Sequence, residues 1–250
     1  MPTDIRRSFH QNLDEVRDDL IRLGGMVTEA LGQATEALLA GDLQTAERII
    51  SDDDRVDALQ IEIEERCYQL LTLQQPMASD MRTIVAALRM VAEIERSGDL
   101  VVNLMKAMRR IYGVELDPRV RGLIAKLSEH VHRLFRLAMD SYADRNDGLA
   151  AALHDMDDTV DELHKEFIQS IFEVHEGGQL PLQTAVQLAL VGRYYERIGD
   201  HAVNIGERVR YMVTGWMPEH TGAARHAAKE AAAALTPAEE IAEDAAADEG

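Results

Sequence analysis

The sequence predicts an all-α protein of two tandem three-helix bundles, with six long helices in a pseudo-two-fold repeat and a disordered C-terminal tail. Three observations support this prediction. Aromatic residues make up only 4% of the 250 residues, whereas β-sandwiches and barrels draw on aromatic and β-branched strands. Apolar residues recur at alternating steps of three and four, which is a helical period. A motif-bearing segment occurs twice, which is typical of a repeat architecture.

Turn residues divide most of the chain into six helical stretches. Pro76 is expected in the first turn of the third stretch, because the fixed backbone of proline suits that position. Gly113–Pro118 interrupts the pattern between the third and fourth stretches. Five of the expected helices span residues 4–40, 42–74, 76–112, 118–143 and 181–213. The remaining one, fifth along the chain, is expected to follow residues 144–148 and to end near residue 175.

Heptad-like stripes of apolar residues predict the buried seams of these helices. The sixth stretch carries Leu188, Val191, Tyr195, Ile198, Ala202, Ile205, Val209 and Met212. The third stretch carries Ala87, Met90, Ile94, Ser97, Val101, Leu104, Met108 and Ile111. The second carries Val56, Leu59, Ile63, Leu70 and Leu73.

The repeat sets the expected domains. Glu95–Asp99 recurs 101 positions later as Glu196–Asp200, and Asp53–Leu59 recurs as Asp157–Leu163. We therefore predict a first bundle over residues 1–112, a linker over 113–117, a second bundle over 118–215 and an alanine-rich acidic tail over 216–250.

The charge balance excludes some functions. There are 26 basic and 45 acidic residues, a net charge of −19, whereas a nucleic-acid-binding protein needs a basic surface. The longest uncharged run, Gly177–Gly192, is shorter than a membrane-spanning helix, so no direct membrane insertion is expected. The single cysteine, Cys67, fits a reducing compartment. We expect a cytoplasmic protein that meets the membrane only through partners.

Pairs of carboxylates four residues apart are the repeated chemical feature. This spacing places both carboxylates of a pair on one helical face, where like charges repel and favour a counter-charge. If the second and third helices of each bundle place their pairs side by side, a multivalent cation is the natural compensation. The predicted metal ligands are Asp53, Asp57, Glu95 and Asp99 in the first bundle and Asp157, Asp161, Glu196 and Asp200 in the second. In the alternative, metal-free interpretation, the pairs are solvated or form salt bridges with Arg96 and Arg197.

The motif Glu-Arg-x-Gly-Asp-x-x-x-Asn occurs twice, with Asp-x-x-Val-Asp upstream, and the segment Leu73–Arg82 precedes the third helix. With these features the sequence resembles the PhoU family. The resemblance covers about residues 5–213. It implies two tandem three-helix bundles whose acidic motifs bind multinuclear iron or zinc clusters, or other divalent ions such as manganese or magnesium. Neighbours of the carboxylates that are expected to orient them are Arg96, Asn103, Arg197, His201 and Asn204.

The same resemblance implies a function without catalysis. Family members are negative regulators that link a phosphate ABC transporter, through its ATPase subunit, to a sensor histidine kinase. One departure from the motif is that His201 follows Asp200, whereas Leu100 follows Asp99, so the two sites need not be equally occupied. A homodimer is compatible with the sequence. Two alternatives stay open, a ferritin-like di-metal carboxylate enzyme suggested by Glu129-x-x-His132, and a metal-free helical adaptor.

Overall fold

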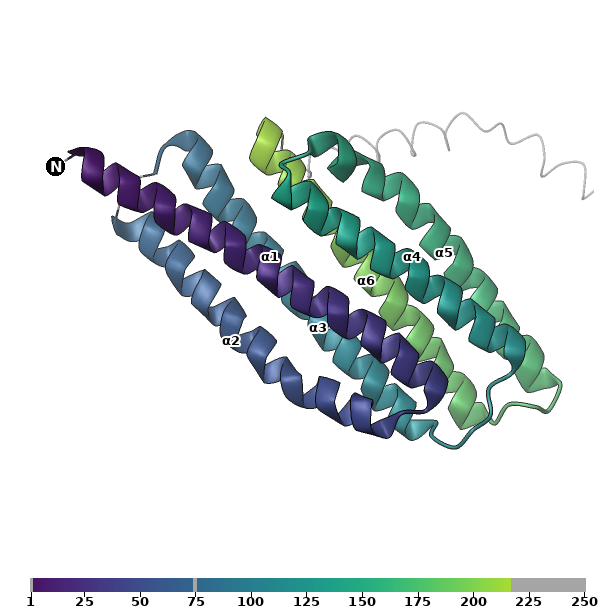
Figure 1. The fold of residues 1–250 in the computed structure, drawn as a ribbon. Coiled ribbons are helices and arrows are strands. Elements are labelled where there is room, and N and C mark those ends of the chain that lie inside the picture. Colours follow the sequence, from purple (N-terminus) through teal and green to yellow (C-terminus); the bar gives the residue numbers. More distant parts are fainter. Residues whose placement is uncertain (1, 74–75, 217–250) are drawn as a thin grey trace, which may run out of the picture. The chain divides into compact units, whose positions relative to one another are not determined.

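Six α-helices make up the part of the chain that the computed structural model describes, residues 2–73 and 76–216. No strand occurs in these ranges, which confirms the all-α prediction. The predicted tail falls on residues 217–250, which lie outside the described residues. The helices are α1 (Pro2–Ala40), α2 (Leu43–Leu73), α3 (Ala78–Arg110), α4 (Pro118–Ala143), α5 (Asp147–Glu176) and α6 (Leu182–Thr214) (Figure 1).

The helices pack as two three-helix bundles. Helices α1, α2 and α3 each contact the other two, and α4, α5 and α6 do the same. Between the bundles, α3 packs along α6 and α1 packs against α4, as can be followed in Figure 1. The α3–α6 pairing is the most extensive of all. The predicted architecture is confirmed, but the helices up to Gly215 form one compact unit with one hydrophobic core, so the boundaries at 113 and 117 stay a prediction.

Side-chain caps fix where three of the helices begin. The carboxylates of Asp42 and Asp117 accept hydrogen bonds from backbone N–H groups in the first turns of α2 and α4. The side chain of Asn146 does the same for α5, at 2.9 Å from the backbone nitrogen of Leu149. These caps satisfy N–H groups that have no partner within the helix, which explains why the turn residues predicted the boundaries.

The third helix of each bundle begins later than the sequence predicts. Pro76 was expected in the first turn of α3, but Met77 has extended backbone angles (φ −70°, ψ 164°) and the helix starts at Ala78. Pro181 is likewise extended (φ −59°, ψ 142°) and precedes α6, which starts at Leu182. In both helices the proline therefore lies before the first turn rather than within it.

The predicted apolar stripes are buried in the hydrophobic core. Seven stripe residues of α3, Ile111 directly after it and all eight stripe residues of α6 are buried, as are the four described stripe side chains of α2, from Val56 to Leu70. Ser97 and Tyr195 are the members of these stripes that carry a hydroxyl, and the Ser97 hydroxyl donates to the backbone carbonyl of Glu93 at 2.8 Å. The heptad pattern thus predicts correctly which face of each helix turns inward.

Three buried hydroxyl groups join the two bundles. Thr35 of α1 lies with its Oγ1 atom 2.6 Å from Ser128 Oγ of α4 and 2.7 Å from Tyr195 Oη of α6. Tyr195 is completely buried, and burial raises its pKa to about 12. Each hydroxyl has a partner, so the network avoids the cost of buried unpaired polar groups and fixes how α1 meets α4 and α6.

Candidate functional site

The predicted carboxylates gather in two clusters, each where the second and third helices of a bundle meet. Cluster 1 has Asp53 and Asp57 on α2 and Glu95 and Asp99 on α3. Cluster 2 has Asp157 and Asp161 on α5 and Glu196 and Asp200 on α6. In each cluster the first carboxylate of each pair is half-buried and the second is exposed. Both clusters therefore lie at the edge of the core and open to solvent.

Cluster 1 behaves as one electrostatic site. Burial, followed by the charges of Asp57 and Asp99, raises the pKa of Asp53 to about 6. Burial and the charges of Asp99 and Asp57 also raise the pKa of Glu95. Because Asp53 and Glu95 each respond to a carboxylate of the other helix, the charges of α2 and α3 act on one another here. The arrangement favours either a bound proton or a bound cation.

Cluster 2 has the same character. Burial, followed by the charges of Asp200 and Asp161, raises the pKa of Asp157 to about 7. Burial also raises the pKa of Glu196, and repulsion from the charge of Asp200 adds to this rise. Burial likewise raises the pKa of Asp200, and repulsion from the charge of Asp161 adds to it. The nearby Arg193 acts in the opposite direction on both. The four carboxylates of α5 and α6 therefore also share one site, but with a cation of the protein beside them.

The helical glycines of the two motifs have different surroundings. A Cβ atom built on Gly199 would come 2.7 Å from Asp157 Oδ1, so this glycine permits the carboxylate to lie directly against α6. A Cβ on Gly98 would stay 3.5 Å from Val56 and 3.7 Å from Asp53 Oδ1, which are ordinary contacts. Close approach of a carboxylate thus explains the glycine in cluster 2 but does not require it in cluster 1.

The counter-charge of cluster 2 comes from a residue that the sequence analysis missed. Arg193 Nη1 donates to Glu196 Oε1 from one turn earlier on α6. The expected neighbours Arg96 and Arg197 are exposed, and their charges only oppose the rise in the pKa of Glu95 and Asp200. The spacing of three between Arg193 and Glu196 was the available signal, because residues three apart are neighbours on a helix.

Two other expected neighbours bind across the bundle interface. His201 Nδ1 lies 2.5 Å from Glu93 Oε2 of α3, and Asn204 Nδ2 donates to the same oxygen at 3.1 Å. Although burial acts in the opposite direction, these hydrogen bonds lower the pKa of Glu93. His201 and Asn204 therefore connect α6 to the first bundle, and Glu93 is a further polar residue that the sequence analysis did not single out. Asn103 is half-buried on α3.

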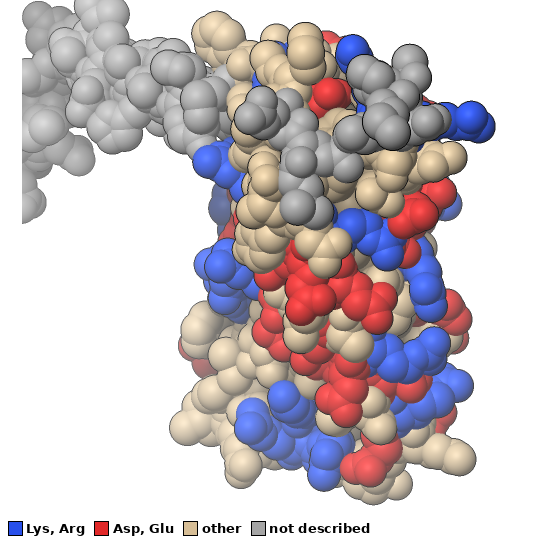
Figure 2. Space-filling model, turned by 90° about the vertical axis from the view of Figure 1, so that its left-hand side faces the viewer, with Lys and Arg blue, Asp and Glu red and all other residues tan. Residues whose placement is uncertain are grey.

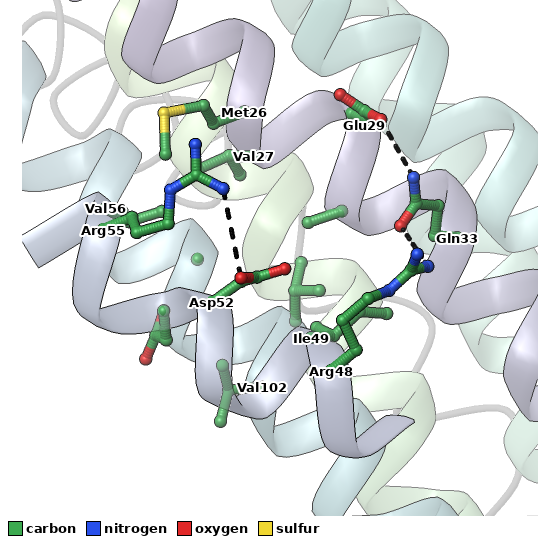
Figure 3. Close-up of a pocket in the computed structure, with 14 residues that line it drawn as sticks. Met26, Val27, Glu29, Gln33, Arg48, Ile49, Asp52, Arg55, Val56 and Val102 are labelled. Carbon is green, nitrogen blue, oxygen red and sulfur yellow. Dashed lines mark hydrogen bonds and ion pairs between the residues drawn. The ribbon is translucent and has the colours of Figure 1, made fainter. Parts of the chain in front are cut away.

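A pocket of about 230 Å³ opens beside cluster 1, between α1, α2 and α3. Asp53 and Gly98 form part of its lining, next to apolar side chains such as Val27 and Val56. Figure 3 shows charged side chains on its rim, where Arg55 pairs with Asp52 and Arg48 donates to Gln33. The pocket gives solutes a route to the half-buried carboxylate of Asp53.

The outer surface is strongly charged. Figure 2 shows a face of the molecule on which acidic side chains gather in a central band with basic side chains around them. Within the described ranges, no helix combines the length and the apolar character that a membrane span requires.

The donor set of both clusters suits a metal ion. Carboxylate oxygens without sulfur are typical ligands of magnesium, manganese, iron and zinc. Among the described residues, three buried polar atoms without a hydrogen-bond partner lie on or beside cluster 2: Glu196 Oε2, His164 Nε2 and His201 Nε2. No three acidic, histidine or cysteine side chains in the described part of the chain converge on one point, so the carboxylates would have to turn inward to share an ion.

A family model matches both bundles. The PhoU domain model matches residues 20–108 and 124–209, once in each bundle. The chain belongs to the PhoU family. Its PhoU relatives include the phosphate-specific transport system accessory protein PhoU homolog 1 of Mycobacterium tuberculosis, 35% identical over 86% of this chain and 96% of the relative. PhoU homolog 2 of the same organism is 34% identical over 86% of this chain and its own full length.

Solved PhoU structures have the same fold. The crystal structure of PhoU from Pseudomonas aeruginosa has a TM-score of 0.79 and 28% identity, and covers 83% of this chain and 100% of that chain. PhoU from Streptococcus pneumoniae, with a TM-score of 0.77 and 24% identity, covers 84% of this chain and 98% of that chain, and supports the fold alone. Each PhoU domain match contains one carboxylate cluster.

Proposed function

We propose that this PhoU-family protein is a metal-binding negative regulator of phosphate uptake and phosphate-starvation signalling. The observation that carries the proposal is its 35% identity, over 86% of the chain, with a protein named as a phosphate-specific transport system accessory protein. The chain spans 96% of that relative, so the likeness extends over both bundles and both clusters. We expect it to act by binding partners rather than by catalysis.

The two partners that we propose are the ATPase subunit of a phosphate ABC transporter and the cytoplasmic part of a sensor histidine kinase. Two similar bundles, each with an acidic cluster at its solvent edge, suit a protein that bridges two partners. We expect the protein in the cytoplasm, at the inner face of the membrane, where both partners are accessible.

Metal binding is the part of the proposal that concerns specific residues. Each cluster combines two half-buried and two exposed carboxylates, and burial, followed by mutual repulsion, raises the pKa of its half-buried members. A bound iron, zinc, manganese or magnesium ion would supply positive charge that cancels this repulsion and orders the surface of the bundle. The carboxylates of α2 and α3 would hold one site, and those of α5 and α6 the other.

A reporter assay tests the regulatory role. Glu95 and Asp99, or Glu196 and Asp200, are replaced by alanine in cells that carry a phosphate-responsive reporter. Repression at high phosphate should be lost while helicity, measured by circular dichroism, is retained. Folded variants with full repression would show that the clusters do not contribute to signalling.

A matched control comes from α1. Asp14 and Asp18 have the same spacing of four residues and are both exposed, but they lie outside the clusters. Replacing both by alanine removes the same charge and should leave repression unchanged. Elemental analysis of protein purified without chelator then separates a metal-binding regulator from a metal-free adaptor, since the Glu196/Asp200 variant should lose metal from the second bundle only.

A further inference from the structure

The two clusters differ at the residue three positions before their glutamate. Cluster 2 has Arg193 before Glu196, and the corresponding residue before Glu95 is Ala92. The eight carboxylates are otherwise matched in type, position and burial. Two sites with the same carboxylate ligands therefore differ in whether an arginine of the same helix lies one turn before the glutamate.

Arg193 forms an ion pair with Glu196 of cluster 2. Its guanidinium donates to one oxygen of Glu196, whose side chain is 13% exposed. Its charge also opposes the rise in the pKa of Asp200, and together with burial it lowers the pKa of His164 on α5. The guanidinium thus supplies positive charge at the cluster that would attract a metal ion. The other carboxylate oxygen, Glu196 Oε2, is buried and has no hydrogen-bond partner among the described residues.

Cluster 1 has no cation in the corresponding position. Ala92 has no charge and no side chain that could reach Glu95. The positive charges that act on this cluster are those of Arg96 and Lys106, both exposed residues of α3. The pocket between α1, α2 and α3 leads directly to Asp53. A cation arriving from solvent therefore meets free carboxylates in cluster 1 but must compete with a guanidinium in cluster 2.

We propose that Arg193 is a built-in counter-ion of cluster 2, so that divalent cations bind cluster 1 first and enter cluster 2 only when Arg193 leaves Glu196. The inference rests on the proposed metal binding by both clusters. An oxygen that accepts a hydrogen bond from a guanidinium cannot at the same time be a metal ligand in that direction, and two cations at one carboxylate repel each other. Because the Arg193 side chain is half exposed, it can swing into solvent without unfolding α6.

Manganese binding to single-cluster proteins tests the proposal. Cluster 1 is inactivated by Glu95→Gln with Asp99→Asn, and cluster 2 by Glu196→Gln with Asp200→Asn, in the full chain. Free Mn²⁺ is followed by electron paramagnetic resonance during titration, and the heat of binding by calorimetry. The protein that retains only cluster 1 should bind Mn²⁺ more tightly than the protein that retains only cluster 2.

Arg193→Ala should then tighten Mn²⁺ binding by about fivefold in the protein that retains cluster 2, the fold-change that corresponds to an ion pair of about 1 kcal/mol. The same substitution should leave the affinity of cluster 1 unchanged. The reciprocal change, Ala92→Arg, should weaken cluster 1. Arg136→Ala, which removes an exposed arginine from α4, controls for the general loss of positive charge.

The outcomes separate the two proposals. If both clusters bind Mn²⁺ equally and Arg193→Ala has no more effect than Arg136→Ala, the counter-ion role is wrong while metal binding stands. If neither cluster binds Mn²⁺ in any variant, the proposed metal binding fails and the counter-ion role fails with it. Circular dichroism of each variant confirms that the helices are retained.

Discussion

Replacing Gly98 with alanine should stabilise the protein, although this glycine lies beside cluster 1. The added Cβ atom would lie 3.5 Å from Val56 Cγ1, 3.6 Å from Val27 Cγ2 and 3.7 Å from Asp53 Oδ1, all ordinary van der Waals distances. In the interior of a helix, alanine is favoured over glycine by about 1 kcal/mol. We therefore expect the free energy of unfolding to rise by about 1 kcal/mol, which corresponds to about 2–4 °C in Tm for a protein of this size.

The matched substitution in the second bundle should behave differently. A Cβ atom on Gly199 would lie 2.7 Å from Asp157 Oδ1, so the carboxylate must turn away and the gain in helix propensity is offset. Urea denaturation followed by circular dichroism, with chelator present, measures both variants. A Gly98→Ala protein that is less stable than the wild type, or two variants that change stability equally, would refute the reasoning from local space.

Three further predictions concern the core and the titration of the clusters. Without metal, the protein should lose stability as the pH rises from 3.8 to about 7, because the native state holds protons on Asp53 and Asp157 more tightly than the unfolded chain does. Asp157→Asn should flatten this slope in denaturation curves measured across the range; a wild-type stability that is constant with pH would contradict it. Thr35→Val should lower the free energy of unfolding by about 1–3 kcal/mol, because two buried hydroxyls lose their shared partner, and Tyr195→Phe by only about 0.5–1.5 kcal/mol. Urea denaturation that finds the larger loss in the phenylalanine variant would be incompatible with Thr35 as the centre of the network. Cys67 is buried with its pKa raised to about 12, so iodoacetamide should label it at neutral pH only after unfolding, as mass spectrometry can establish; rapid labelling of the native protein would disagree.

The helices and their buried faces could be predicted because they depend on local periodicity. A stripe such as Leu188 to Met212 repeats every three or four residues, and only a helix places all of its members on one side. The turn residues before Leu43 and Pro118 cap the helices with their own side chains, so these boundaries also follow from nearby sequence. The repeat then placed equivalent carboxylates on equivalent helices.

The partners of individual side chains could not be predicted in the same way. Glu93 precedes a stripe residue and resembles a solvated glutamate until α3 packs on α6, which brings His201 and Asn204 to its carboxylate. Gly98 and Gly199 are identical in the motif, and only the packing of α2 and α5 distinguishes their surroundings. Contacts between segments that are distant in sequence depend on helix rotation and separation, which a periodic pattern does not specify.

The polar contact between α3 and α6 also bears on how such a chain could evolve by duplication. In the repeat, Glu93 corresponds to Tyr194 and His201 to Leu100, so the two halves carry different residues at this contact. If the first bundle paired with a copy of itself through α3, Glu93 would be buried against Leu100. It would then lack the imidazole of His201 and the amide of Asn204, which bind its carboxylate in this chain. Each half therefore carries the polar groups that the other half needs at this contact. A separated first half is therefore expected to associate with the second half in preference to itself.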